Sequence, residues 1–159
     1  DQLVLGAPLL GNENDDRAVM QIITADTQAY DDGETAICFM GHGSDAAANA
    51  IYSDFQQRLH RAAYRNYYIG TVEADPTLEQ LLALVRTGGN YKRVLLQPLM
   101  VVAGDHAHHD MAGEDDESWK RTFEKAGYEV TCIVKGLGEL EGIRNIYVSH
   151  VRNCIKQML

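Results

Sequence analysis

Four short apolar runs alternate along the chain with longer stretches of helical periodicity, and this alternation limits the possible folds more than any other feature. The runs cover residues 35–40, 66–72, 93–102 and 128–134. Strands that alternate with helices form a parallel sheet, because each crossover helix returns the chain to the same end of the sheet. We therefore predict a single α/β domain over residues 1–159, doubly wound, with a parallel sheet and helices on both faces.

The borders of these elements carry recognisable local signals. Ser44 or Asp45 is expected to begin the helix after the first strand. Thr77 and Gln80 have the spacing of a capping box, in which each side chain bonds the backbone N–H of the other. Pro98 cannot donate a hydrogen bond to a sheet ladder, so the third strand should end or bulge there.

Composition excludes several classes of partner. The chain of 159 residues has a formal net charge of −9, which argues against nucleic acid because phosphate binding needs clustered Lys and Arg. Its apolar runs are too short to span a membrane. Neither phosphate-loop pattern, GxxxxGKS/T or GxGxxG, is present, so no nucleotide is expected. Three well-separated cysteines without CxxC spacing indicate buried thiols and, with them, a cytoplasmic location: Cys38, Cys132 and Cys154.

Polar side chains follow three successive predicted strands at the point where each ends. His42 follows the first strand, Glu73 the second, and Asp105 with His106 the third. Ligands of parallel α/β sheets bind beyond the carboxyl ends of the strands, so these groups should meet at one edge. Two imidazoles and a carboxylate make a suitable site for a divalent first-row metal with coordination positions left open.

Glycines flank both histidines of this predicted site. Gly41 and Gly43 enclose His42, and Gly104 precedes His106 by two residues. Because glycine turns sharply and has no side chain, we expect these positions to leave room for a bulky ligand beside the imidazoles.

The remaining histidines have less specific interpretations. His60 is expected on the surface of a helix, and His150 in the core or at its rim. His108 and His109 either widen the metal site or face water. The segment HAHHDM also approaches HxHxDH, the zinc signature of metallo-β-lactamase-like hydrolases, but Met111 occupies the last ligand position, so a metallohydrolase is a weaker alternative.

Several motifs, in order, resemble one enzyme family over about residues 36–150. They are FMGHGSDAAANAIY, TVEADP, PLMVVAGDHAHHDMAGEDDESWK and GLGELEGIRNIYVSH. These segments are similar to the anaerobic cobalt chelatases of cobalamin biosynthesis, which insert Co²⁺ into sirohydrochlorin without ATP. The resemblance implies a chelatase-like, flavodoxin-like three-layer sandwich. It also implies that His42, Glu73 and His106 hold the metal, and that His42 and His106 accept the pyrrole protons.

The resemblance further implies what lies around the site. The family has two similar α/β halves with a cleft between them, and this chain resembles the carboxy-terminal half, with the amino-terminal half absent. We therefore expect the missing half or a second copy, in a homo-oligomer, to complete the cleft. Met100 and its neighbours would pack against the tetrapyrrole, and Lys92, Arg93, Lys120 or the missing half would contact its carboxylates. A metal- or tetrapyrrole-binding domain without turnover is the alternative function.

Overall fold

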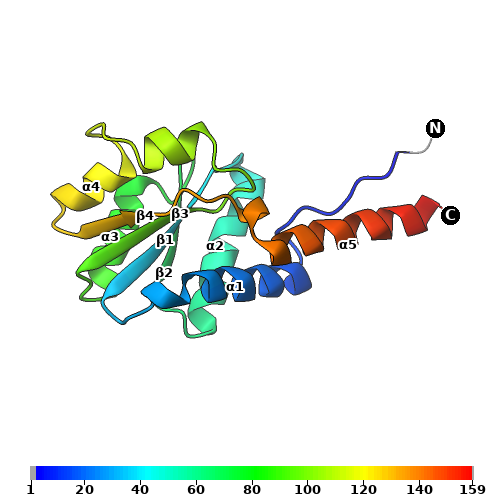
Figure 1. Cartoon of the computed structure of the whole chain (residues 1–159), viewed down its shortest axis with the longest axis horizontal. Helices are drawn as coiled ribbons and strands as arrows, with labels where there is room; N and C mark the ends of the chain where they lie inside the picture. Colours follow the sequence, from blue (N-terminus) through cyan, green and yellow to red (C-terminus); the bar gives the residue numbers. More distant parts are fainter. Residues whose placement is uncertain (1–2, 159) are drawn as a thin grey trace.

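The protein is described here by a computed structural model of residues 3–158. Figure 1 shows a sheet enclosed between two layers of helices, with the last helix extending to one side. The strands are β1 (Thr35–Gly41), β2 (Tyr67–Thr71), β3 (Arg93–Pro98) and β4 (Glu129–Cys132). The α-helices are α1 (Glu13–Thr27), α2 (Ala46–Arg61), α3 (Leu78–Gly88), α4 (Trp119–Lys125) and α5 (Glu141–Met158). Short turns of other helical types are η1 (Gln28–Tyr30), η2 (His106–Met111) and η3 (Leu137–Glu139).

All pairings in the sheet of the described residues are parallel, and the strand order is β2-β1-β3-β4. The order reverses between β1 and β3, because the chain leaves β1 for β2 on one side and then returns to pair β3 on the other. Such a switch point opens a crevice at the carboxyl ends of the strands. The sequence placed His42 and His106 at those two strand ends.

Alternating residues of the central strands supply two separate hydrophobic cores. Ile37 and Phe39 of β1 face the core formed with α1, α2 and α5. Cys38 and Met40 face the opposite core, formed with α3, α4 and η2. Every residue of β1 is buried, as expected for a strand covered on both faces. The predicted α/β architecture with helices on both faces is therefore confirmed.

Local signals placed most element borders correctly. Thr77 and Gln80 form the predicted capping box at the start of α3. Strand β3 ends at Pro98, as its missing N–H requires.

His60 is half-buried instead of on the surface, because its Nε2 lies 3.0 Å from the Tyr67 carbonyl oxygen.

The outer edge of β2 is closed by a side chain of α2. Gln56 accepts a hydrogen bond from the Ile69 N–H at 2.7 Å and donates one to the Tyr67 carbonyl at 2.7 Å. The amide thus takes the place of a neighbouring strand, and these two backbone groups are not free to pair with another chain.

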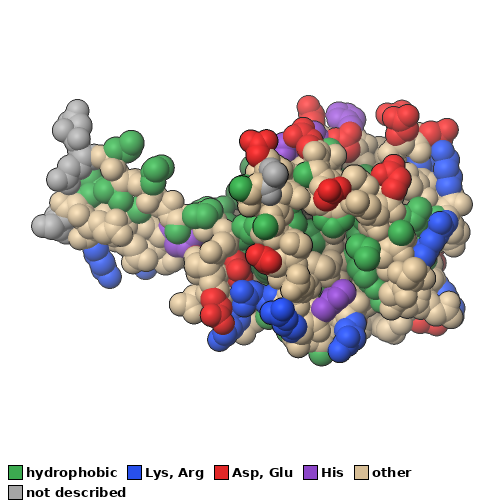
Figure 2. Space-filling view, turned by 180° about the vertical axis from the view of Figure 1, so that it is seen from behind, with side chains coloured by type: hydrophobic (Ala, Val, Ile, Leu, Met, Phe, Trp, Pro, Cys, Tyr) green, Lys and Arg blue, Asp and Glu red, His purple; other side chains and the backbone are tan. Residues whose placement is uncertain are grey.

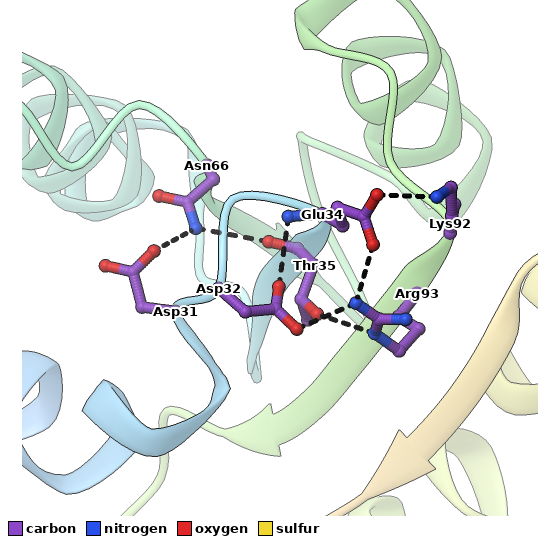
Figure 3. A network of polar contacts seen from close by, with 7 residues as sticks. All are labelled: Asp31, Asp32, Glu34, Thr35, Asn66, Lys92 and Arg93. Atoms are coloured by element: carbon purple, nitrogen blue, oxygen red, sulfur yellow. Dashed lines mark hydrogen bonds and ion pairs between the residues drawn. The ribbon is translucent and has the colours of Figure 1, made fainter.

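The amino ends of the strands carry an ion-pair network that includes Lys92 and Arg93 (Figure 3). Arg93 contacts Asp32 at 2.8 Å and Glu34 at 3.1 Å, and Lys92 also contacts Glu34. These residues precede or begin β1 and β3, at the end of the sheet opposite His42 and His106. The expectation that Lys92 and Arg93 contact a ligand at the strand carboxyl ends is therefore wrong.

The first ten residues of the last helix anchor it to the body. Ile143 is fully buried, and His150 Nε2 lies 2.7 Å from Asp15 Oδ2 in the first turn of α1, so the predicted core or rim position of His150 is correct. Beyond His150 the helix leaves the body and runs beside the amino-terminal segment (Figure 1). Within the described residues, the helices are all too short or too polar to cross a membrane.

Candidate metal centre

The structure brings the three predicted ligands together at the carboxyl edge of the sheet. One potential ligand atom from each of His42, Glu73 and His106 lies within 4.8 Å of the other two. The three residues follow β1, β2 and β3, which are adjacent strands. Their side chains are partly open to solvent, between 35% and 58% exposed. A cation could therefore approach the three groups from outside without unfolding of the site.

His42 and Glu73 are joined through both their backbones and their side chains. The Glu73 N–H donates to the His42 carbonyl at 2.9 Å, one step beyond the end of the β1–β2 ladder. His42 Nδ1 lies 3.6 Å from Glu73 Oε2 and 3.2 Å from the Gly43 carbonyl oxygen. A proton on Nδ1 can be donated to that carbonyl, which leaves the Nε2 lone pair of His42 available to a metal.

Two residues of α2 hold the loops that carry His42 and Glu73. The Asn49 side chain accepts a hydrogen bond from the Ser44 N–H at 3.3 Å and donates one to the Asp75 carbonyl at 2.6 Å. The Tyr52 hydroxyl accepts from the Gly43 N–H at 3.2 Å. Asn49 thus bridges the two loops, and sequence reasoning did not single it out. Its only signal is its place on the first turns of the helix that follows GHGS.

Gly41 and Gly43, which flank His42, require glycine for different structural reasons. Gly43 adopts a φ of +97°, and a Cβ there would lie 2.9 Å from the Ala74 backbone nitrogen. It therefore supplies the predicted sharp turn and lets the two loops touch. A Cβ at Gly41 would lie 2.3 Å from the Tyr52 ring, so the space beside Gly41 is filled by Tyr52 and not left for a ligand, contrary to expectation.

The structure finds open space beside Gly104, as expected, and leaves the ligand contact of Met100 as a prediction. A Cβ at Gly104 would meet no atom within 4 Å, so neither a close approach nor a left-handed turn requires glycine at this position. Its carbonyl instead accepts hydrogen bonds from the N–H groups of Ala107 and His108. Met100 is half-buried against the core of α3 and α4, and Val101 and Val102 beyond it are exposed.

His106 begins a π-helical turn, η2, that sequence analysis did not predict. The Ala112 N–H donates to the Ala107 carbonyl, five residues back, as in π-helices. Ala107 and Met111 are fully buried in the core and anchor the turn. The wider turn places Asp110 against His106, with Oδ2 at 2.5 Å from Nδ1. This pairing orients the imidazole and leaves Nε2 as the nitrogen available to a metal.

The remaining polar residues of η2 do not join the three-residue centre. His108 Nδ1 lies 3.0 Å from the Gly104 carbonyl, and His109 pairs loosely with Asp105 at 3.7 Å. Asp105 is 97% exposed. Met111 points into the core, so the segment does not form the ligand set of the hydrolase signature. Among residues 3–158, His42, Glu73 and His106 form the one group of three or more His, Cys, Asp or Glu residues whose ligand atoms all lie within 4.8 Å of one another.

Acidic residues and hollows surround the centre. A cavity of about 410 Å³ is lined by Asp110, Asp115, Glu117 and Trp119 among others, and one of about 570 Å³ lies beside Glu73. Figure 2 shows acidic side chains gathered together with histidine along the upper edge of the body. Lys120, a predicted contact for substrate carboxylates, is paired with Glu114, and this pairing raises the pKa of Lys120. The described surface is therefore suited to attract a cation.

Comparison with known proteins identifies the family. The sequence model of the cobalt chelatase (CbiK) family matches residues 1–156. A sirohydrochlorin cobaltochelatase of Salmonella typhimurium is 38% identical over 156 residues, which are 97% of this chain and 57% of that protein. Sirohydrochlorin cobaltochelatase CbiKC of Nitratidesulfovibrio vulgaris is 33% identical over 154 residues, 97% of this chain and 54% of that protein. The chain thus spans just over half the length of these relatives, and it belongs to the cobalt chelatase (CbiK) family.

Proposed function

We propose that this chain forms the metal-handling half of an enzyme that inserts Co²⁺ into sirohydrochlorin, in cobalamin biosynthesis, without a nucleotide. The observation that carries the proposal is the convergence of His42, Glu73 and His106 from three adjacent strand ends. The family membership and the names of both relatives support cobalt as the substrate metal and sirohydrochlorin as its acceptor. A cytoplasmic site of action belongs to the same proposal, and the three free cysteines favour it.

In this proposal the three side chains hold Co²⁺ loosely before transfer. Two neutral imidazoles and one carboxylate leave several coordination positions for water or for the incoming ring nitrogens. Because the ligands are partly exposed, the ion keeps part of its hydration and is not trapped in a closed cage. The transfer exchanges these ligands for the four nitrogens of the macrocycle, and the metal leaves the protein with the product.

Insertion also releases two pyrrole protons, and the histidines are the proposed acceptors. Neutral imidazole accepts protons near physiological pH. Once the metal has moved to the ring, the Nε2 atoms of His42 and His106 are free to take these protons. While Nε2 of His106 takes a proton, its Nδ1 keeps the contact with Asp110.

The tetrapyrrole is proposed to lie over the strand ends, next to Gly43, Gly104 and Met100. Gly41 supports this surface indirectly, through the room it gives to Tyr52. The macrocycle carries many carboxylates, whereas the described cations near the site are already paired with acids. The opposite wall, with cationic contacts, is therefore assigned to the additional length of the relatives or to a second copy.

Calorimetric titration of Co²⁺ tests the metal centre directly. The unmodified chain is expected to bind one ion, and the His42→Ala/His106→Ala variant to lose that binding. The matched control is His108→Ala/His109→Ala, which removes two nearby imidazoles outside the centre and should leave binding unchanged. Loss of binding in the control but not in the first variant would place the metal on η2 and contradict the proposal.

Turnover is measured separately, from the absorbance change when Co²⁺ enters sirohydrochlorin. The complete enzyme is expected to show insertion that the His42→Ala/His106→Ala variant lacks. Specific Co²⁺ binding with no insertion under any condition would favour the alternative of a metal- or tetrapyrrole-binding domain without turnover.

A further inference from the structure

Arg144, near the start of α5, is an exposed cation beyond the carboxyl end of β4. Its Nη1 donates hydrogen bonds to the carbonyl oxygens of Gly138 at 3.0 Å and Glu139 at 2.7 Å. Both carbonyls belong to η3, the short turn that connects β4 to α5. Arg144 forms no ion pair with any of the described residues, so its charge is not matched by a neighbouring carboxylate in this part of the chain.

The two hydrogen bonds of Arg144 leave its other donors available. A guanidinium presents five N–H groups in a fixed plane, and both bonds to η3 use Nη1. The N–H groups of Nε and Nη2 therefore remain, and together they form the edge that pairs with a carboxylate through two parallel hydrogen bonds. Because the carbonyls of η3 already hold the other side of the group, this edge is oriented before any ligand arrives.

The turn η3 is fixed against the segment that connects β3 to η2. The Leu137 N–H donates to the Met100 carbonyl at 2.8 Å, and the Gly138 N–H donates to the Val101 carbonyl at 2.9 Å. A Cβ at Gly136 would lie 2.5 Å from the same Val101 oxygen, so the two segments touch through their backbones. Arg144 is thus held, through η3, beside the segment that leads from the sheet to the proposed metal ligand in η2.

A hollow lies between these two segments. It has a volume of about 470 Å³, and its lining includes three exposed or half-exposed valines: Val101, Val102 and Val134. Glu139 also lines it, but the Glu139 carboxylate accepts a hydrogen bond from the Gly136 N–H at 2.9 Å. Arg144 binds the backbone of two lining residues, Gly138 and Glu139, and so stands at the rim. An apolar wall with a cation at its rim suits a ligand that has an apolar body and peripheral carboxylates.

We infer that Arg144 binds a peripheral carboxylate of the tetrapyrrole while the macrocycle lies against Val101 and Val102. This inference rests on the proposed function, because it takes sirohydrochlorin as the acceptor of the metal. The cations on the other flank of the site, such as Lys120, are paired with acids, whereas Arg144 is not. Arg144 therefore gives this half of the site a cationic contact of its own, in addition to those assigned to the additional length of the relatives.

Steady-state kinetics of Co²⁺ insertion by the complete enzyme test the contact. Arg144→Gln removes the charge but keeps an amide that can donate to the η3 carbonyls. It should raise the KM for sirohydrochlorin about 10- to 100-fold, as expected for loss of charge-assisted hydrogen bonds, and leave kcat nearly unchanged. Arg144→Lys should recover part of the loss, because it restores the charge without the planar fork. The matched control, Arg152→Gln, removes the same charge farther along α5 and should change neither constant.

Binding of metal-free sirohydrochlorin, followed by its fluorescence, tests the same contact without turnover. The Kd of the Arg144→Gln enzyme should rise by the same factor as its KM, whereas Co²⁺ affinity in calorimetric titration should not change. If Arg144 served only to hold η3, Arg144→Gln would lower the free energy of unfolding in urea but leave Kd and KM unchanged, which would overturn the inference.

Two further outcomes separate this inference from the proposed function. Equal losses of sirohydrochlorin affinity in Arg144→Gln and Arg152→Gln would show an effect of general charge and would also overturn the inference. An unmodified enzyme that binds sirohydrochlorin but does not insert Co²⁺ would contradict the proposed function alone, because the Kd still reports on Arg144. An unmodified enzyme that does not bind sirohydrochlorin would contradict both.

Discussion

His106 and Asp110 contact each other across a single π turn, with Nδ1 and Oδ2 2.5 Å apart. The carboxylate fixes the ring of a proposed metal ligand and selects the nitrogen that faces the metal. Groups that orient ligands in this way typically contribute 10- to 100-fold to metal affinity. We therefore expect Asp110→Asn to weaken Co²⁺ binding by about 10- to 100-fold in calorimetric titration.

The control for this change is Asp105→Asn, which removes the same charge from an exposed carboxylate on the same segment. It should alter Co²⁺ affinity little. Equal losses in the two variants would mean that Asp110 acts only through its general negative charge, not through His106.

Gly43→Ala should damage both folding and metal binding. The position has a φ of +97°, and the new Cβ would approach the Ala74 nitrogen to 2.9 Å, so the loops bearing His42 and Glu73 must separate. Such backbone strain costs about 1–3 kcal/mol in the free energy of unfolding. Urea unfolding and Co²⁺ titration measure the two effects. Gly104→Ala, where the added methyl meets no atom within 4 Å, should be nearly neutral in stability.

Asn49→Ala should weaken Co²⁺ binding more than it destabilises the fold. The variant loses the bridge between Ser44 and Asp75, so the distance between His42 and Glu73 is no longer fixed, whereas the net stability of one or two such bonds is only about 1–2 kcal/mol. Ser53→Ala removes a hydrogen bond within the same helix and serves as the control. If Co²⁺ affinity stays at the unmodified level in Asn49→Ala, the two loops do not need this bridge.

Asp32 should contribute stability only above acidic pH. The Glu34 N–H, the Thr35 hydroxyl and Arg93 lower the pKa of the Asp32 carboxyl from 3.8 to about 2 (Figure 3). A carboxyl with a depressed folded-state pKa stabilises the fold above its unfolded pKa and loses this effect as pH falls through the folded value. Asp32→Asn should therefore lower the free energy of unfolding near neutral pH. The difference from the unmodified chain should shrink between about pH 4 and pH 2, and a difference constant over that range would contradict the assignment.

The sheet and the neighbourhood of the three proposed ligands followed from the sequence because both depend on strand direction and periodicity. Once β1, β2 and β3 were placed in parallel, His42, Glu73 and His106 had to emerge at the same edge. The same reasoning, applied consistently, would have excluded Arg93. It begins β3, so the full length of the strand separates it from that edge.

Features that depend on contacts distant in sequence were not predictable in this way. The space beside Gly41 is filled by a ring from the next helix, and no local pattern shows this. The turn at His106 escaped detection because hydrophobic periodicity distinguishes 3.6 from 2 residues per repeat, and a single wider turn gives no repeat at all. Asp110 therefore appeared only as part of a rival motif, although it is the residue that contacts His106.

The π turn makes the number of residues in this segment as important as their identity. In the π turn between Gly104 and Gly113, each backbone hydrogen bond spans five residues instead of the four of an α-helix. The hydrogen-bonded ring therefore contains one additional residue. Loss of any single residue would allow the segment to relax into a regular helix. His106 would then rotate away from His42 and Glu73 while Ala107 or Met111 left the core. In this segment a substitution keeps the spacing of His106, Ala107 and Met111, whereas a one-residue deletion does not.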